Sequence, residues 1–259
     1  MMNPVEQKSL DQRVTQWFGQ ARNLIIQRMA EHFEVEHKTS RSDLVTSVDR
    51  EVEQLYISLI RQADPQARIL SEEGYGDDLG DLSGHVWFID PIDGTMNFVK
   101  QQSDFASMLA LYIDGQPVLG WIMNVMDDQL IHGGPEIGVK LNAVILPALK
   151  NTALEDGLVY LSGARLLQGQ YNFPAIAKAA LSYRVYGSAG ISLCQVFLGR
   201  AVAYASRLKP WDFAAGLVLA KGLGLKATLI DGDPINMLSS GTVLVATTQA
   251  YTDIQLLNK

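Results

Sequence analysis

The chain has 259 residues, of which 47% are hydrophobic and 19% charged, so it holds enough apolar side chains for one large domain or two small ones. Its formal net charge of -7 argues against a protein that binds nucleic-acid phosphates, because such proteins carry a basic face, and favours a small-molecule ligand. Cys194 is the only cysteine, which excludes an internal disulfide and is typical of a reducing compartment.

Nothing in the sequence indicates secretion or membrane insertion. Residues 1–18 are polar and acidic where a signal peptide would have an apolar run. No other stretch has the apolar length that a bilayer-spanning helix needs. We therefore expect a cytoplasmic protein with neither a membrane nor a nucleic-acid partner.

The first predicted elements are two amphipathic helices. Apolar residues recur at steps of three and four from Val14 to Phe33, which predicts one helix over this range. A second helix follows, with Asp49 as its N-cap and with Glu51 and Glu53 near its positively polarised end, where carboxylates are favourable. Asp49 is thus expected at the mouth of a helix.

Strands follow in the next part of the chain. The apolar run 86–89 predicts a buried strand that ends at Asp90-Pro91, and loops at strand ends are where sites are often built. The ranges 105–113 and 118–126 are strand-like and flank Asp114-Gly115, which predicts a hairpin and hence an antiparallel sheet. Residues 1–150 are therefore expected to form an α+β subdomain.

In the second half of the chain, strands and helices alternate. We expect strands at 158–161, 184–186, 201–205, 225–230 and 242–246, and helices at 173–181, 191–198, 212–221 and 252–257. This rhythm is typical of α/β structure. We place the subdomain boundary near residue 150, so that residues 151–259 form an α/β subdomain.

Acidic residues stand at the ends of three predicted elements. They are Glu72, the pair Asp90 and Asp93, and Asp212. Taken singly, Glu72 and Asp93 are explained as turn residues and Asp212 as a helix N-cap. Asp90 and Asp93 fit that explanation less well, because two carboxylates so close together repel each other unless a cation lies between them. Carboxylate oxygens suit Mg²⁺, which is therefore the predicted cofactor.

Five segments of the chain have an order and a spacing that point to one family. They are Asp43–Asp49, Ser71–Gly74, Trp87–Phe98, Gly187–Ala189 and Trp211–Gly216. With these segments the chain resembles the inositol monophosphatase family of lithium-sensitive, Mg²⁺-dependent phosphomonoesterases, and the resemblance spans most of its length. It implies a layered αβαβα sandwich of the sugar-phosphatase type, divided into two subdomains.

The resemblance implies a site for two or three Mg²⁺ ions, for which Mn²⁺ can substitute. Glu72, Asp90 and the Ile92 carbonyl would bind one ion, and Asp90, Asp93 and Asp212 would bind a second. Such a pair of ions clamps the transferring phosphoryl group, lowers the pKa of a bound water and neutralises the leaving oxygen. The implied reaction is the hydrolysis of a phosphate monoester by metal-activated water.

Other residues match the family's catalytic and substrate-binding positions. Asp49 and Thr95 correspond to the pair that orients and deprotonates the attacking water, together with Glu72, although a helix N-terminus should make Asp49 a weak base. Lys38 falls at a family lysine position. Plain capping for Asp49 and a solvated surface position for Lys38 remain alternatives. The substrate contacts implied are Asp93, Gly94, Thr95, Gly187, Ser188, Ala189 and Asp212, with the Gly94 and Thr95 amides on phosphate oxygens.

Departures from the family concern the substrate. Ala205 or Ser206 stands where inositol monophosphatases place the Glu that holds inositol hydroxyls. Arg207 and Lys209 would offer a second phosphate a partner, since Arg binds phosphate through a planar fork, unless both are solvated loop residues. We expect a small phosphate ester as substrate, either inositol 1-phosphate or a related sugar or polyol phosphate. Fructose-1,6-bisphosphatase and 3'(2'),5'-bisphosphate nucleotidase activities on the same fold are alternatives.

Two other classes are weighed against this reading. A haloacid-dehalogenase-type phosphatase would attack phosphorus with Asp90 itself. In that class the second Asp stands two positions after the first, whereas Asp93 stands three positions after Asp90. A catalytically silent relative that serves as an interaction module would be expected to have lost a carboxylate, and all are present. The resemblance also implies a homodimer and inhibition by lithium.

Overall fold

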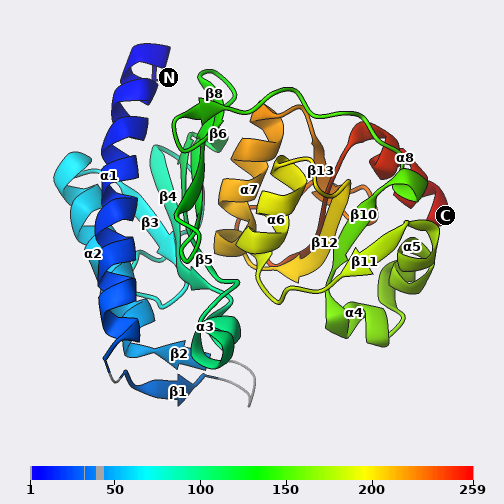
Figure 1. Ribbon diagram of the computed structural model, residues 1–259. Helices are drawn as coiled ribbons and strands as arrows, with labels where there is room; N and C mark the ends of the chain where they lie inside the picture. The colour runs from blue at the N-terminus through cyan, green and yellow to red at the C-terminus, as the bar shows by residue number, and fades with distance from the viewer. Residues whose placement is uncertain (1, 32, 39–43, 259) are drawn as a thin grey trace.

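The computed structural model describes residues 2–31, 33–38 and 44–258, and its helices and sheets are stacked in five layers (Figure 1). The order across the molecule is helices, a seven-stranded sheet, helices, a five-stranded sheet and helices. This confirms the predicted αβαβα sandwich. Asp43, the first residue of the predicted 43–49 segment, lies outside the described residues.

The first layer consists of α1 (Pro4–Met29) and α2 (Ser47–Ala63), which pack on each other and on the large sheet. Helix α1 begins at Pro4, well before Val14, where its apolar stripe starts. It begins there because Asn3 and Glu6 form a capping box. The predicted start at Val14 was therefore wrong. The two helices and the outer face of the sheet enclose one hydrophobic core.

The seven strands of the large sheet follow one another in chain order. They are β3 (Arg68–Ser71), β4 (His85–Asp93), β5 (Ala106–Ile113), β6 (Gln116–Asn124), β7 (Gln129–Gly134), β8 (Gly138–Leu141) and β9 (Val144–Ile145). Strands β3 and β4 are parallel, and the later neighbours are antiparallel. The predicted hairpin around Asp114-Gly115 is confirmed as β5–β6. A separate short pair, β1 (Val35–His37) and β2 (Leu44–Thr46), lies below α2 and contacts α3 (Thr95–Gln101).

Strand β4 does not end at Asp90 as predicted. It continues to Asp93, and its register with β5 shifts between Asp90 and Asp93. Pro91 lies inside this irregular stretch, where its missing N–H removes no regular ladder bond. Both carboxylates therefore lie at the C-terminal end of β4.

The central layer is formed by α6 (Ala189–Phe197) and α7 (Pro210–Gly222). Helix α7 packs on strands of both sheets, and α6 packs on β5, β6 and β12 (Ala203–Leu208). Gly120 allows a close approach of β6 to α7, since an added Cβ would lie 2.8 Å from the Ala215 carbonyl oxygen. A second hydrophobic core fills the space between the two sheets.

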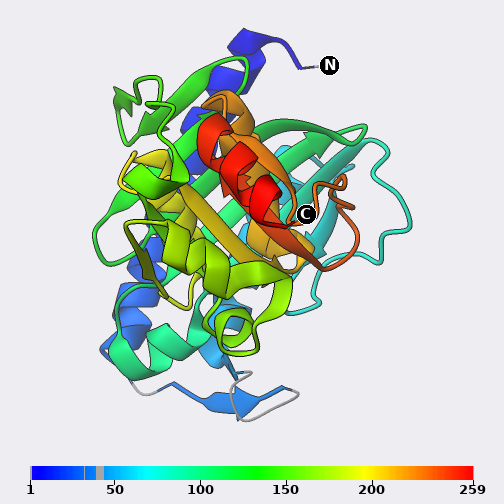
Figure 2. The same cartoon turned by 90° about the vertical axis from the view of Figure 1, so that its right-hand side faces the viewer.

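The small sheet has the order β11-β10-β12-β14-β13, with β10 (Leu158–Leu161), β11 (Ser182–Arg184), β13 (Lys226–Leu229) and β14 (Gly241–Ala246). Strands β11, β10 and β12 are parallel, and β14 and β13 are antiparallel. Helices α5 (Phe173–Ala179) and α8 (Thr248–Leu257) cover its outer face, with α4 (Gly163–Leu167) beside α5 (Figure 2). The predicted strand at 184–186 lies two residues earlier.

The two sheets are joined by residues 146–157, which contain only a 3₁₀ turn, Leu154–Asp156. The predicted boundary near residue 150 falls in this connection, and the division into two subdomains stays a prediction. Within the ranges described above, no helix combines the length and the apolar character needed to cross a membrane.

Candidate active site

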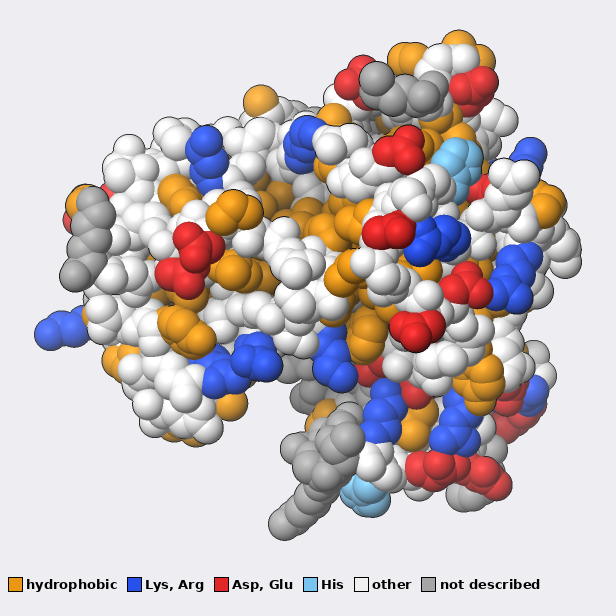
Figure 3. All heavy atoms as spheres, turned by 180° about the vertical axis from the view of Figure 1, so that it is seen from behind, with side chains coloured by type: hydrophobic (Ala, Val, Ile, Leu, Met, Phe, Trp, Pro, Cys, Tyr) orange, Lys and Arg blue, Asp and Glu red, His pale blue; other side chains and the backbone are white. Residues whose placement is uncertain are grey.

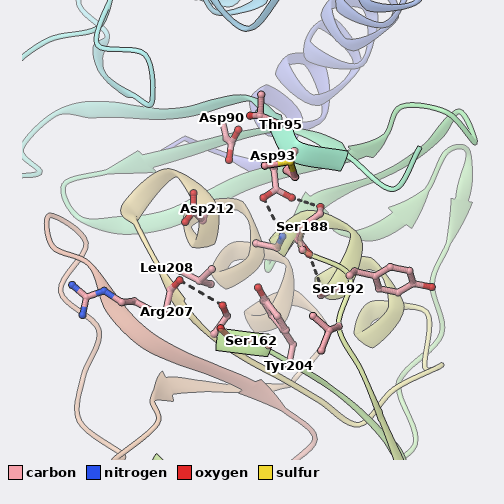
Figure 4. A pocket seen from close by; sticks show the side chains of 18 of the residues that line it. Asp90, Asp93, Thr95, Ser162, Ser188, Ser192, Tyr204, Arg207, Leu208 and Asp212 are labelled. Atoms are coloured by element: carbon pink, nitrogen blue, oxygen red, sulfur yellow. Dashed lines mark hydrogen bonds between the residues drawn. The ribbon is translucent and has the colours of Figure 1, made fainter. Parts of the chain in front are cut away.

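A cavity of about 330 Å³ lies where the C-terminal end of β4 meets the N-terminal ends of α3, α6 and α7 (Figure 4). Both halves of the chain contribute to its wall. The predicted site residues that line it are Glu72, Asp90, Ile92, Asp93, Gly94, Thr95, Gly187, Ser188, Ala189, Arg207 and Asp212. Asp49 does not line the cavity, but its Oδ1 accepts a hydrogen bond from Thr95 Oγ1 at 3.2 Å.

Asp90 is the most unusual residue of the cavity. Its side chain is buried, and its Oδ1 has no hydrogen-bond partner among the described residues. Burial raises the pKa of Asp90 well above its usual range, and the carboxylates of Glu72, Asp93 and Asp212 raise it further. A buried carboxylate without a counter-charge is costly, so this position favours a cation.

Asp93 connects the two halves of the molecule. Its Oδ1 accepts from the Ala189 amide at 3.0 Å, and its Oδ2 accepts from the Gly190 amide at 2.7 Å and from the Ser188 hydroxyl. Burial raises the pKa of Asp93 to about 6 even though these hydrogen bonds oppose the change. The predicted Gly187–Ala189 segment thus meets Asp93 directly.

Asp212 lies in the first turn of α7, with its Oδ2 accepting from the Lys209 amide at 2.8 Å. It therefore caps the helix, although from inside the first turn and not as the N-cap residue. It also lines the cavity, where burial raises its pKa well above the usual range. The structural and the functional explanations of this residue coexist.

Glu72 approaches the cavity from the loop after β3. Its carboxylate accepts a hydrogen bond from Lys38 Nζ at 3.0 Å, and the same ammonium lies 2.5 Å from Glu73. Burial opposes the charge of Lys38, but Glu72 and Glu73 together raise its pKa above the ordinary value. Lys38 is therefore not a solvated surface residue; its side chain is 22% exposed.

Two expectations about Asp49 were wrong. Thr46 is the N-cap of α2, and Asp49 is the acidic partner in its capping box, where its Oδ2 accepts from the Thr46 amide at 2.8 Å. The helix N-terminus also does not make Asp49 a weak base. Burial outweighs the hydrogen bonds from Thr46 and raises the pKa of Asp49 to about 6.

Strand parity decides how β12 contributes to the site. Tyr204 and Leu208 belong to the core between the sheets, whereas Ala205 belongs to the core on the outer side. Since side chains alternate, Ser206 faces the cavity, and of the two residues expected at the position of the family's Glu it is the one that lines the cavity. Arg207 leaves the strand on the opposite side, and its exposed side chain extends away from the carboxylates (Figure 4).

The other predicted cation, Lys209, does not line the cavity. Its ammonium lies 5.1 Å from the centre of the Trp211 ring, an arrangement typical of a cation–π contact. Basic side chains nonetheless gather on both sides of the notch between the two halves of the molecule (Figure 3).

Sequence reasoning missed several residues of the cavity wall. Ser162, Ser192 and Tyr204 line it, together with Leu161 and Val185. Ser162 directly follows strand β10, so the rule that loops at strand ends build sites would have identified it. Ser192 and Tyr204 carry no comparable signal, because they lie inside an apolar helix and a buried strand.

The donor set fits a hard divalent cation. Four carboxylates surround the cavity, one from the loop after β3, two from β4 and one from α7, and one buried oxygen among them has no partner in the described chain. As they stand, no three Asp, Glu, His or Cys side chains in the described part of the chain converge on a single point. Asp93, Asp212 and Glu72 instead accept hydrogen bonds from amides, a hydroxyl and an ammonium of the protein itself.

Residues 6–258 match the model of the inositol monophosphatase family. The chain is 38% identical over 240 residues to an inositol-1-monophosphatase of Bacillus subtilis, with 91% of each chain covered. It is 30% identical over 210 residues to a fructose-1,6-bisphosphatase/inositol-1-monophosphatase of Thermotoga maritima, covering 81% of this chain and 80% of that one. A crystal structure of an IMPase/NADP phosphatase with Mg²⁺ and phosphate superposes with a TM-score of 0.87 at 27% identity, covering 97% of this chain and 95% of the other.

Proposed function

This chain belongs to the inositol monophosphatase family, and we propose that the cavity at the end of β4 is the active site of its phosphatase reaction. It is a phosphoric monoester hydrolase whose reaction depends on Mg²⁺. The observation that carries the location is Asp90, whose buried oxygen lacks a partner among the described residues and lies amid three further carboxylates. Membership of this family argues against the haloacid-dehalogenase type, and the presence of all four carboxylates at the cavity argues against a silent module.

The proposed ligands are those that the sequence indicated. Glu72, Asp90 and the Ile92 carbonyl would hold one ion, and Asp90, Asp93 and Asp212 would hold another, with room for a third ion and for Mn²⁺ in place of Mg²⁺. When bound, the ions supply charge neutralisation at the phosphoryl group and the leaving oxygen, and they lower the pKa of the attacking water.

Asp49 and Thr95 are proposed to orient that water. Thr95 Oγ1 lies 3.2 Å from Asp49 Oδ1 and 3.1 Å from the Ile92 carbonyl oxygen, and its single hydroxyl proton is donated to these acceptors. The Thr95 oxygen therefore keeps its lone pairs for a water on the cavity side, which it holds with a fixed orientation. The Gly94 and Thr95 amides, at the start of α3, are proposed to hold phosphate oxygens.

For the substrate we propose inositol 1-phosphate and related sugar or polyol phosphates. The names of the two relatives support this range, since one is an inositol-1-monophosphatase and the other also a fructose-1,6-bisphosphatase. Ser206 offers the substrate a hydroxyl where the family's inositol phosphatases have a carboxylate, which favours a broad scope. A second phosphate, as in fructose 1,6-bisphosphate or a 3'(2'),5'-bisphosphate nucleotide, would reach Arg207 only at the outer rim of the cavity.

A substrate panel tests these proposals. Activity toward every ester should vanish with a chelator and return with Mg²⁺. The panel should include inositol 1-phosphate, fructose 1,6-bisphosphate and a nucleotide bisphosphate, ranked by kcat/KM for the wild type, Arg207→Ala and Lys209→Ala. Arg207→Ala should weaken bisphosphates selectively, and Lys209→Ala, which lies off the cavity, should leave the ranking unchanged. An unchanged ranking in both variants would remove Arg207 from the site.

We also propose a cytoplasmic homodimer that lithium inhibits. The buried free thiol of Cys194 is compatible with a reducing compartment. Sedimentation tests the assembly, because a single chain has a mass of 28.5 kDa. A mass of one chain at micromolar concentration would contradict the dimer.

A further inference from the structure

Glu53 has a role that its place in the sequence does not indicate. It was expected only as a carboxylate near the positively polarised start of α2, yet the residue is completely buried. Its carboxylate accepts three hydrogen bonds, from the Ser71 hydroxyl at 2.6 Å, the Glu73 amide at 2.8 Å and the Tyr75 amide at 3.0 Å. All three donors belong to one loop, which follows β3 and carries Glu72.

This loop turns around the Glu53 carboxylate. The Ser71 oxygen, which donates to Glu53, also accepts from the Gly76 amide at 3.0 Å, so the two ends of the loop meet at one hydroxyl. Gly76 has to be a glycine, because an added Cβ would lie 2.4 Å from the Ile69 carbonyl oxygen. The Glu72 amide donates a hydrogen bond to the Ile89 carbonyl of β4 at 3.2 Å, and the Glu72 carboxylate accepts one from Lys38.

Burying a carboxylate whose partners are only neutral donors is costly, so Glu53 is a poor choice for stability alone. It is a good choice for fixing a loop, since an ionised carboxylate is purely an acceptor and can gather several N–H and O–H groups at once. Helix α2 also carries Asp49, four residues earlier and hence on the same face as Glu53. One rigid helix therefore holds both the Thr95 partner and the Glu72 loop.

We infer that Glu53 is a positioning residue for metal binding: it fixes the Glu72 loop relative to Asp49 and so sets the affinity for Mg²⁺. The inference rests on the proposed role of Glu72 as a ligand. Partners that orient a metal ligand typically change the metal affinity about 10–100-fold when they are replaced. Glu53 itself is not among the residues that line the cavity.

Glu53→Gln is the informative variant. It keeps the volume and one acceptor oxygen, but it turns an amide N–H₂ toward a backbone N–H of the loop, which repels it. The affinity of metal-free Glu53→Gln protein for Mn²⁺ should be about 10-fold or more weaker than that of the wild type. The EPR signal of free Mn²⁺ measures this affinity. The Glu73 and Tyr75 amides should exchange faster with solvent deuterium in the same metal-free protein. At saturating Mg²⁺, kcat should stay within about threefold of wild type, because the ligands themselves are intact.

Three further variants make the result decisive. Asp11→Asn changes another buried carboxylate of the same half, remote from the cavity, and should leave Mn²⁺ affinity unchanged. Ser71→Ala removes only the hydroxyl bridge and should weaken Mn²⁺ binding less than Glu53→Gln, which gives a second reading if the latter does not fold. Wild-type affinity in Ser71→Ala and in any folded Glu53→Gln protein would overturn the inference. Wild-type affinity in Glu72→Gln would instead overturn the proposed ligand set.

Discussion

Two groups of side chains, each built around a buried carboxylate from the first half of the chain, behave in opposite ways. Asp11 on α1 accepts hydrogen bonds from Trp121 at 3.0 Å, from the His132 ring at 2.6 Å and from Lys140 at 3.2 Å. Asp90 on β4 is equally buried, at 1% exposure each, but has an oxygen without any partner in the described chain. Burial opposes the charge of Asp11, yet His132 and Lys140 hold its pKa below the usual range, whereas the pKa of Asp90 is raised.

Burial alone therefore does not distinguish a structural carboxylate from a functional one. Asp11 is completed by its own chain, which ties α1 to strands β6, β7 and β8. Asp90 is left incomplete among other carboxylates, and only a group from outside the chain can complete it. The contrast predicts that changes in the first group alter stability, and changes in the second alter activity.

The largest effect is expected for Asp90→Asn. Phosphatase activity should fall about a thousandfold or more, because the proposed bridge between the ions is lost. The melting temperature of the metal-free protein should rise by a few degrees, since a buried charge that repels Glu72, Asp93 and Asp212 is removed. Steady-state kinetics and calorimetry in EDTA measure the two quantities. A lower melting temperature for the metal-free variant would show that the Asp90 carboxylate stabilises the fold, which contradicts the contrast with Asp11.

Asp11→Asn should have the opposite profile. Removing this charge leaves His132 and Lys140 without their buried partner, which should lower the free energy of unfolding by about 3 kcal/mol. The folded fraction should retain kcat/KM within about twofold, because the cluster does not touch the cavity. Denaturant titration and kinetics at low temperature test this. A large loss of kcat in the folded protein would mean that the cluster also acts on the active site.

The two groups should also give stability an opposite dependence on pH. The folded pKa of Asp11 lies below the ordinary value of 3.8, so its contribution is present above that value and is lost as the pH falls through the folded pKa. The folded pKa of Asp49, about 6, is raised, so in the metal-free protein its contribution is present below 3.8 and is lost as the pH rises through about 6.

Melting temperatures between pH 3 and pH 8 in EDTA, roughly the range in which these carboxylates titrate, measure both limbs. Asp11→Asn should flatten the acid limb, and Asp49→Asn should flatten part of the fall toward neutral pH. The other carboxylates at the end of β4 contribute to the same fall. Stability that rises from pH 4 to pH 7 without metal would contradict the assigned directions.

The smallest effect is expected for Lys140→Met. The Lys140 side chain is 25% exposed and lies at the solvent end of the Asp11 cluster, so solvent screens its interaction. The loss of unfolding free energy should be about 1 kcal/mol or less, and activity should not change. Chemical denaturation at low and high salt measures it. A loss as large as that of Asp11→Asn would show that Lys140, and not His132, is the main partner.

Much of the acidic site could be predicted because each carboxylate ends or opens an apolar run. Asp90 and Asp212 mark a strand and a helix at the point where both enter the cavity. The layered fold followed from the resemblance, and the apolar patterns located most of its elements within a few residues. Short strands such as β1 and β2 escaped because three residues carry too little pattern.

Glu53 and Arg207 show where the sequence ceases to inform. Glu53 looks like any polar residue on a surface helix, and its partners lie 18 to 22 residues further along the chain. Only the packing of α2 beside the loop after β3 reveals its position. Arg207 stands close to Asp212 in sequence, but the alternation of side chains along β12 directs it away from the carboxylates, to the outer rim of the cavity.

Helix α7 has a consequence for how this protein folds. It packs on both sheets at once, and most of its residues are buried. Because α7 is apolar on both sides, its surface is fully buried only when both sheets pack against it. Neither half of the chain can bury it alone. Unfolding should therefore occur in a single calorimetric transition whose van't Hoff and measured enthalpies agree. A chain cut within residues 146–157 should yield fragments that aggregate when separate and regain activity only when they refold together.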